Sequence, residues 1–196
     1  REHYSFEKAL DAYAKHGKMR IAVTSQEVIT LKYPWDLLKV KDFILEKQKR
    51  SISKKATIAK SAKITGDVVI EEGAQIADNV VIQGPCYIGQ NTFIGTNSLL
   101  RNYTDIEDNV VIGAYMEIKN SLIMERAKTH SGFIGDSVVG ANTRIGALFG
   151  TANVRLDREN VKVKVKVEKV DSGLRSLCAI IGDNVVIGER VSTMPG

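Results

Sequence analysis

The strongest constraint in this sequence is an aliphatic residue that returns at every sixth position. The members of this series are Ile58, Ile64, Ile70, Ile76, Ile82, Ile88, Ile94, Leu100, Ile106, Ile112 and Ile118. Neither an α-helix, which repeats about every 3.6 residues, nor an alternating strand produces such spacing. The period is typical of a parallel β-helix, in which each six-residue step supplies a short strand and one turn of a prism. The sequence therefore predicts a mainly β fold with the aliphatic positions stacked inside.

Asparagines support the same fold. They recur where the turns of the prism are expected, and their side chains tolerate the left-handed backbone that such turns use; the residues are Asn79, Asn91, Asn97 and Asn109.

The repeat becomes irregular beyond Ile118 and resumes in "IIGDNVVIGERV", with Ile181 and Ile187. Between these points we expect an inserted loop at about residues 146–179. It contains "VKVKVKVEKV", whose strict alternation predicts a β-ribbon with one apolar face. Insertions in a solenoid collect on the face that carries function, so the loop is a candidate part of a site.

Residues 1–50 lack the repeat and predict a short α/β segment. We expect an amphipathic helix over 5–18, strands in "MRIAVTS" and "VITLK", and a second helix in "YPWDLLKVKDFILEKQKR". In the second helix the residues expected to face inward are Leu37, Leu38, Val40, Ile44 and Leu45. Because the chain begins at Arg1 rather than at methionine, we expect it to be a piece of a longer protein.

Composition indicates the cellular compartment and the classes of partner to expect. No apolar run approaches the roughly 18 residues of a membrane span, and no signal peptide is visible, so we expect a cytoplasmic protein without a membrane partner. Cys86 and Cys178 are interpreted as free thiols in a reducing compartment. The net charge of +5 includes lysine clusters at 47–55 and 161–169, which suit either a phosphate-bearing small molecule or solvated surface. No nucleic-acid recognition motif accompanies them, so no nucleic-acid partner is expected.

Several stretches resemble one protein family. "KTHSGFIGDSVVG", "GTANVRLD", "NVKVKV" and "IIGDNVVIG" resemble the C-terminal portion of the archaeal-type bifunctional sugar-1-phosphate nucleotidylyltransferase/amino-sugar-1-phosphate N-acetyltransferases. The resemblance covers nearly the whole chain. It implies that residues 1–50 are the C-terminal remnant of a nucleotidyltransferase domain with its linker helix. It also implies that residues 51–196 form a left-handed β-helix acetyltransferase domain. The left hand comes from the resemblance, since crossover rules favour the right hand.

The resemblance implies acetyl-CoA-dependent N-acetylation of an amino-sugar 1-phosphate, either glucosamine or galactosamine 1-phosphate, in nucleotide-sugar biosynthesis. It also implies a homotrimer with active sites between subunits. Acetyl-CoA is then a co-substrate, and acetyl transfer needs no metal. Magnesium is expected only for the absent nucleotidylyltransferase half. We expect no nucleotidyl transfer by this chain itself, because no glycine-rich nucleotide loop precedes the first helix.

The resemblance also implies roles for single residues. The family histidine at the position of His130 removes a proton from the substrate amine, and Asn153 matches an asparagine beside that amine. An alkylammonium has no lone pair for attack on a thioester, and imidazole, with an ordinary pKa of about 6.5, is a suitable base. Arg101 and Lys119 match cations that hold the sugar phosphate, for which charge-assisted hydrogen bonds are suited. We expect these four residues to meet in one crevice.

Two further positions are assigned to the coenzyme side: the chain around Ala147, and Lys162 on the ribbon. Phe133 and Arg144 depart from the family pattern. Phe133 stands where the family has tyrosine, and Arg144 belongs to "RIGALFGTAN", which replaces a smaller, glycine-rich stretch. Both are placed among the substrate-binding residues.

Each of these residues also has a purely structural interpretation, as a turn residue, a solvated charge or a packed side chain. One alternative function is a non-catalytic β-helix that trimerises and regulates the nucleotidylyltransferase. A zinc-dependent β-helical carbonic anhydrase would need three histidines, and only His130 lies in the repeat. No metal site is therefore expected.

Overall fold

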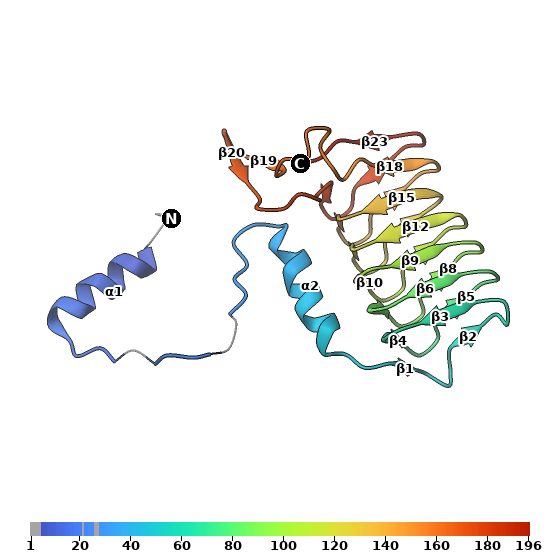
Figure 1. Cartoon of the computed structure of the whole chain (residues 1–196), viewed down its shortest axis with the longest axis horizontal. Coiled ribbons are helices and arrows are strands. Elements are labelled where there is room, and N and C mark those ends of the chain that lie inside the picture. The colour runs from blue at the N-terminus through green and yellow to red at the C-terminus, as the bar shows by residue number, and fades with distance from the viewer. Residues whose placement is uncertain (1–4, 21, 26–27) are drawn as a thin grey trace.

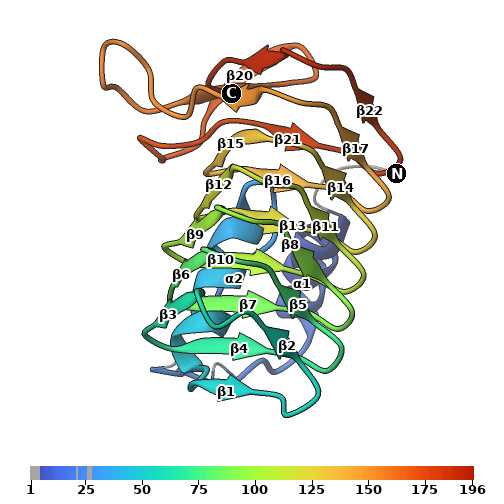
Figure 2. The ribbon, with the colours of Figure 1, turned by 90° about the vertical axis from the view of Figure 1, so that its right-hand side faces the viewer.

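The protein is a left-handed parallel β-helix preceded by two helices (Figures 1 and 2). The computed structural model describes residues 5–20, 22–25 and 28–196. Three parallel sheets of seven strands each form the faces of the prism. Sheet A contains β1 (Ser51–Ile52), β4 (Val68–Ile70), β7 (Cys86–Ile88), β10 (Thr104–Ile106), β13 (Leu122–Ile123), β16 (Val138–Val139) and β21 (Ile180–Ile181).

The other two sheets follow the same order along the axis. Sheet B contains β2 (Thr57–Ile58), β5 (Gln75–Ile76), β8 (Phe93–Ile94), β11 (Val111–Ile112), β14 (Lys128–Thr129), β17 (Arg144–Ile145) and β22 (Val186–Ile187). Sheet C contains β3 (Lys63–Thr65), β6 (Val81–Gln83), β9 (Leu99–Arg101), β12 (Met116–Lys119), β15 (Gly132–Gly135), β18 (Phe149–Thr151) and β23 (Ser192–Thr193). The prediction of a mainly β, left-handed solenoid is confirmed.

The repeated aliphatic residues form the interior of the prism. From Ile70 to Ile118 every member of the six-residue series is at most 3% exposed, whereas Ile58 and Ile64 at the open end are only partly covered. Parallel register places each member on its counterpart in the next coil, as where Ile94 pairs with both Ile76 and Ile112. Full burial of such a side chain contributes about 1.5–3 kcal/mol, so this column is the main source of stability.

Left-handed backbone marks the corners of the prism. Many corner residues are asparagine with φ near +55°, including Asn79, Asn91, Asn97 and Asn109. Asparagine and aspartate adopt this conformation more readily than other residues with a side chain. The expectation that these asparagines occupy turns is confirmed.

Helix α2 (Asp36–Lys47) lies against the outer face of sheet A, where it contacts β13 (Figure 1). Its start is fixed by Asp36, whose carboxylate accepts hydrogen bonds from the Lys32 and Tyr33 N–H groups at 2.9 and 2.8 Å. Trp35 and Leu38 pack with residues of the β-helix and the insertion in a second apolar cluster, namely Leu122, Val138, Val161 and Leu177. The helix therefore covers one side of the prism.

The buried face of α2 differs from the expected one. Leu38 and Leu45 are buried, but Ile44 is 49% exposed and Lys41 is only 2% exposed. The Lys41 ammonium donates to the Tyr103 carbonyl and to Asn120 Oδ1, the latter at 2.9 Å. A lysine therefore occupies the centre of the contact because the corner of the prism offers it oxygen acceptors.

Helix α1 (Ser5–His16) forms as expected, but the strands expected before α2 do not. Residues 19–20, 22–25 and 28–32 carry no strand, while Ile21, inside the first expected strand, lies outside the described residues. Val23 is 93% and Val28 72% exposed. A strand needs a neighbouring strand to accept its hydrogen bonds, and none of the described strands pairs with these segments. In Figure 1, α1 stands apart from the prism, and none of its residues is buried.

The insertion begins later than expected. Strand β18 still belongs to sheet C, so the chain leaves the prism after Thr151 rather than near Gly146. The predicted ribbon is an antiparallel hairpin of β19 (Lys162–Val165) and β20 (Glu168–Asp171). Its valines, Val163, Val165 and Val170, pack against the apolar cluster beside α2. Among the described residues, no helix is both long and apolar enough to span a bilayer.

Thr129 interrupts the aliphatic column of sheet B, where it stacks between Ile112 and Ile145. Its side-chain oxygen is buried without a hydrogen-bond partner. Because an unsatisfied buried hydroxyl is unfavourable, we expect Thr129→Val to raise the free energy of unfolding by about 1 kcal/mol. Urea denaturation measures this change.

Thr92 is the matched control. Its Oγ1 donates to the Glu107 carbonyl at 2.7 Å and accepts from the Val110 N–H at 3.0 Å. Thr92→Val should therefore destabilise by about 1–2 kcal/mol. If both substitutions changed the free energy of unfolding in the same direction, Thr129 would not be an unsatisfied polar group.

Asp105 lies on the covered face of sheet A, and its Oδ1 is buried without a partner. Burial, followed by repulsion from Glu107, raises the pKa of Asp105 to about 7, although Lys41 opposes the shift. The unfolded carboxyl titrates near 3.9, so the folded state holds more protons between these values and stability falls as pH rises through that interval.

We expect Asp105→Asn to remove this loss. Between about pH 4.5 and 7.5 the wild type should lose on the order of 2 kcal/mol relative to the variant. Free energies of unfolding measured at several pH values provide the comparison. A difference between the two proteins that stays constant with pH would disprove the raised pKa.

Candidate functional site

The outer face of sheet C presents two cations on neighbouring rungs. Arg101 ends β9, Lys119 ends β12, and the two residues are register partners. Their neighbours Leu100 and Ile118 point into the prism, so alternation along the strand turns the cations outward. The sequence period therefore determines that both charges share one face.

Each cation is held by a carboxylate on the next rung. Arg101 donates through Nε at 2.9 Å and Nη2 at 2.6 Å to Glu117 Oε1. Lys119 Nζ donates to Asp136 Oδ2 at 3.0 Å. The Arg101 and Lys119 side chains remain 29% and 23% exposed. Each therefore keeps donor groups available for an anion from outside.

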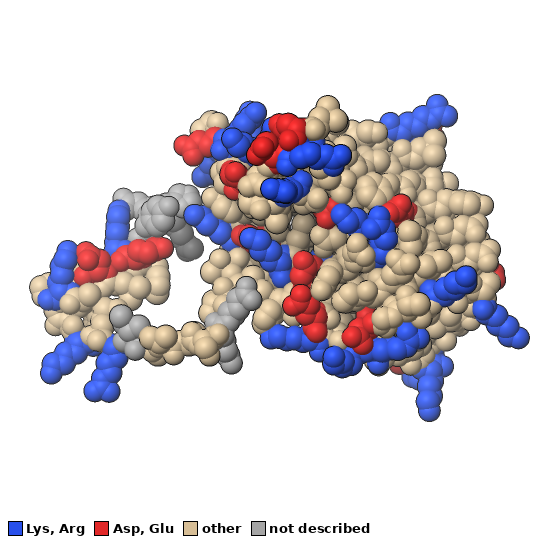
Figure 3. Space-filling model, viewed as in Figure 1, with Lys and Arg blue, Asp and Glu red and all other residues tan. Residues whose placement is uncertain are grey.

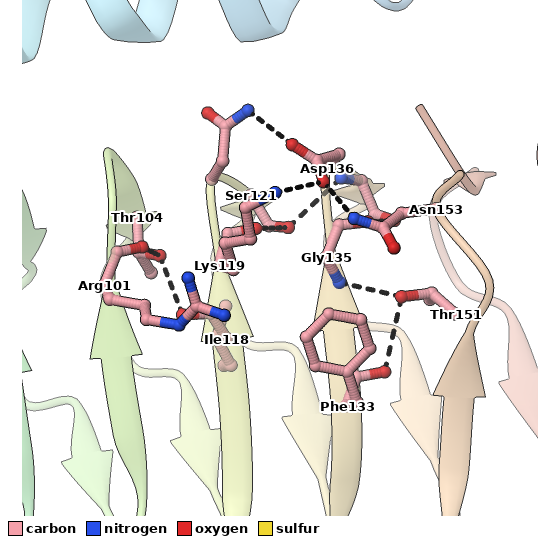
Figure 4. Close-up of polar contacts among 12 residues, drawn as sticks. Arg101, Thr104, Ile118, Lys119, Ser121, Phe133, Gly135, Asp136, Thr151 and Asn153 are labelled. Atoms are coloured by element: carbon pink, nitrogen blue, oxygen red, sulfur yellow. Dashed lines mark hydrogen bonds and ion pairs between the residues drawn. The ribbon is translucent and has the colours of Figure 1, made fainter. Parts of the chain in front are cut away.

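Asp136 is the centre of this site, and sequence analysis did not single it out. The residue is 2% exposed and follows β15 at a corner of the prism. Besides Lys119, it accepts Asn120 Nδ2 at 2.7 Å on Oδ1 and Asn153 Nδ2 on Oδ2. Figure 4 shows Asp136 between Lys119 and Asn153. One signal in the sequence could have identified Asp136: it is a carboxylate at a corner position where other coils carry asparagine.

The Phe133 ring and the Asn153 amide both lie close to Gly135. A Cβ atom added to Gly135 would lie 2.5 Å from Phe133 Cζ and 3.3 Å from Asn153 Nδ2. The aromatic ring and the amide therefore occupy the space over the glycine, as Figure 4 shows. A side chain at this position would therefore displace the ring.

His130 lies at a different corner, between sheets B and C. Its backbone N–H donates to the Ile145 carbonyl at 3.0 Å, whereas its side chain is exposed. It lines a shallow hollow together with Gly113, Ala114, Lys128 and Arg144. Arg144 and Lys128 are register partners, so two cations line the same hollow as the imidazole. The ring is accessible to a ligand and is not part of the core.

Within one chain the candidate residues form two groups rather than one crevice. Arg101 and Lys119 are level with Gly135 at the end of β15, near Phe133 and the Asn153 amide, whereas His130 and Arg144 line the hollow at the corner before β15. β15 is four residues long. At roughly 3.3 Å per residue its two ends are on the order of 10 Å apart. A ligand contacting both groups must extend along sheet C.

Ala147 and Lys162 occupy separate positions. The Ala147 carbonyl accepts the Arg190 N–H at 2.8 Å, and its own N–H takes no part in the hydrogen bonds of the described residues. Ala147 follows β17, the strand that supplies Arg144. Lys162 is exposed on the hairpin and is the register partner of Asp171. The structure therefore associates Ala147, but not Lys162, with the coil above His130.

The two cysteines are poor reactants. Burial raises the pKa of Cys86 to about 12 and also raises that of Cys178, so neither thiol is a ready nucleophile. Burial lowers the pKa of Lys41 despite the nearby Asp42 carboxylate. In the described part of the chain, no three His, Cys, Asp or Glu side chains are grouped as metal ligands.

Comparison with known sequences identifies a consistent set of relatives. The profile of the GMPPB C-terminal domain family matches residues 82–169. A protein named bifunctional protein GlmU from Methanococcus maripaludis strain C7 is 48% identical over 189 residues, covering 96% of this chain and 45% of that protein. The GlmU protein of Methanocaldococcus jannaschii is 42% identical over 164 residues, covering 83% of this chain and 40% of the relative.

A third relative is named bifunctional sugar-1-phosphate nucleotidylyltransferase/acetyltransferase and comes from Sulfurisphaera tokodaii. It is 43% identical over 77 residues, covering 39% of this chain and 19% of that protein.

Among solved structures, a single-site mutant of perosamine N-acetyltransferase from Caulobacter crescentus, in complex with CoA and GDP-perosamine, superposes with a TM-score of 0.51. It is 15% identical and the match covers 77% of this chain and 62% of that chain, so it shows a shared fold. This chain spans less than half the length of the curated relatives it matches. By sequence and fold, it belongs with the C-terminal portion of the bifunctional sugar-1-phosphate nucleotidylyltransferase/acetyltransferases.

Proposed function

We propose that this chain carries the acetyl-transfer activity of a bifunctional enzyme and uses acetyl-CoA to N-acetylate an amino-sugar 1-phosphate, glucosamine or galactosamine 1-phosphate. One observation carries the proposal. Two paired but accessible cations, Arg101 and Lys119, lie on the outer face of sheet C, and Asn153 shares the Asp136 carboxylate with Lys119. An accessible histidine stands at the corner of the same sheet. The kinship with GlmU proteins supports this chemistry.

The roles follow from the available donors and acceptors. Lys119 and Arg101 would bind the sugar phosphate, because an ammonium and a guanidinium form strong charge-assisted hydrogen bonds with phosphate oxygens. Phe133 would pack against the sugar ring. Asn153 would lie beside the amine. The magnesium-dependent nucleotidyl transfer proposed for the whole protein involves none of these residues.

The reaction needs one proton transfer before the acetyl group moves. The His130 imidazole accepts a proton from the substrate ammonium, and the amine nitrogen then attacks the thioester carbonyl carbon. The nitrogen adds to the carbonyl carbon, and the carbon–sulfur bond then breaks. The attacking nitrogen loses a second proton, which the departing sulfur takes up, so that the coenzyme leaves as a thiol. The Ala147 N–H would donate to the carbonyl oxygen, where negative charge develops. Arg144 and Lys162 would contact the anionic groups of the ligands.

A second copy of the chain would complete the site. Within one chain, β15 separates His130 from Asn153, and the hollow beside His130 is shallow and open to solvent. In Figure 3, much of the prism surface on the right is without charged side chains, whereas charges of both signs crowd the region of α2 and the ribbon. We therefore propose a homotrimer in which each active site lies between neighbouring prisms. Because Cys86 and Cys178 are free thiols, we assign the protein to the reducing cytoplasm.

Loss of the base is the direct test. We expect His130→Ala to lower the rate of coenzyme thiol release by about 100-fold or more, because positioned acid–base catalysis contributes about 10²–10⁴-fold. The melting temperature should stay unchanged, since the side chain is exposed. Thiol release is measured with acetyl-CoA and each amino-sugar 1-phosphate.

His16→Ala on α1 is the matched control, because His16 is also exposed and lies outside the prism. It should retain the wild-type rate. If His130→Ala were as active as His16→Ala, His130 would be excluded as the base. Inactivity of the wild type as a trimer, with either sugar, would instead favour the non-catalytic role in assembly.

Gly135→Ala tests where the amino-sugar substrate binds. The new methyl group should displace the Phe133 ring and the Asn153 amide, and we expect kcat/KM for the amino sugar to fall at least about tenfold while the free energy of unfolding changes by less than about 1.5 kcal/mol. Gly150→Ala is the control, because its Cβ would meet only Ser192 Oγ at 3.6 Å. Equal kinetics for the two variants would disprove an acceptor site over Gly135.

A further inference from the structure

Asp136 holds three polar groups, two from the adjacent residues Lys119 and Asn120 and one from Asn153 in a later coil. Its Oδ2 accepts from Lys119 and Asn153, and its Oδ1 accepts from Asn120. Asn120 in turn accepts a hydrogen bond from Lys41 of α2 at 2.9 Å. A continuous hydrogen-bonded chain therefore runs from the centre of α2 to Asn153. With three donors around a side chain that is 2% exposed, the buried carboxylate is well compensated.

The backbone alone does not explain the carboxylate. Asn102, Asn120 and Asp136 occupy equivalent corners of successive coils, with φ values of +53°, +45° and +49°. Asparagine is therefore compatible with this corner, and it is used in two of the three coils. The difference at position 136 lies in the chemistry of the side chain, since only a carboxylate accepts from all three donors without presenting a donor of its own.

That chemistry determines the orientation of Asn153. An ionised carboxylate is an acceptor only, so the Asn153 amide must turn its Nδ2 toward Asp136. Its Oδ1 then points away from Asp136, as Figure 4 shows, and takes part in none of the hydrogen bonds of the described residues. An outward carbonyl oxygen suits an N–H donor from a ligand and repels a developing oxyanion.

We infer that Asp136 is a positioning residue that fixes Asn153 as a hydrogen-bond acceptor for the substrate amine and aims the Lys119 ammonium at the sugar phosphate. This inference rests on the proposed function. It assigns Asn153 to the amine side of the reaction and not to the oxyanion. It also predicts that a sugar substrate with an amino group binds better than one with a hydroxyl at the same position, because the hydroxyl supplies a single hydrogen-bond donor.

The first experiment needs no catalysis. In the wild-type protein labelled with ¹⁵N, the Asn153 side-chain NH₂ signal, identified by its loss in Asn153→Ala, should exchange with water at least about tenfold more slowly than that of the exposed Asn102. In Asp136→Asn the protection should disappear. Fast exchange of the Asn153 signal in the wild type would overturn the inference, whether or not any variant folds.

The second experiment measures kinetics with the amino-sugar 1-phosphate. Asp136→Asn should lower kcat/KM for the sugar by about 10-fold to 100-fold while KM for acetyl-CoA stays unchanged. Asn153→Ala should add little in that background, because both substitutions remove one unit of function. A folded Asp136→Asn protein with wild-type kcat/KM, or fully additive effects, would disprove the positioning role.

Asn102→Asp is the matched control, since it makes the opposite exchange at an equivalent corner and should change neither readout. The two experiments also separate the inference from the proposed function. A wild type without acetyl transfer but with a protected Asn153 NH₂ group would refute the function and leave the orientation of Asn153 established. An active wild type with an unprotected Asn153 NH₂ group would support the proposed function and refute the orientation of Asn153.

Discussion

The structure depends on the stacking of buried aliphatic side chains along the axis of the prism. Ile94 packs between Ile76 and Ile112 because parallel register holds consecutive coils level. Each coil therefore buries its apolar residue only if its neighbours do the same, as in other solenoids. Because the coils are in register, the equivalent outward-facing residues of successive coils are aligned on the same face of the prism. A site can be assembled from residues that are far apart in sequence without any long loop to align them.

The corners of the prism provide the second constraint. They require left-handed backbone, which asparagine and aspartate tolerate, so the sequence is free to place either an amide or a carboxylate at these points. Asp136 uses that freedom: at the same backbone angles as Asn102 and Asn120, it introduces a buried negative charge. The charge gathers Lys119, Asn120 and Asn153 and thereby converts a structural corner into the centre of a polar site.

Helix α2 connects this site to the residues that precede the prism. Lys41 lies buried between the helix and the corner, where it donates to the Tyr103 carbonyl and to Asn120. Trp35 and Leu38 anchor the start of the same helix against sheet A and the insertion. The helix and the site are therefore parts of one packed unit.

The sequence alone determined the solenoid, because a six-residue aliphatic period satisfies no other regular structure, and it also predicted helices α1 and α2 and the ribbon, each from its own periodicity. It did not determine the strands expected before α2, since a strand forms only where another strand accepts its hydrogen bonds. Resemblance pointed to His130, Lys119 and Asn153 and predicted that they meet in one crevice, whereas within one chain they form two groups. Only the tertiary structure decided that Lys119 and Asn153 meet on Asp136 and that His130 stands at the other end of β15. It also buried Lys41, because contacts between coils depend on register and corner geometry, which a local pattern of residues does not contain.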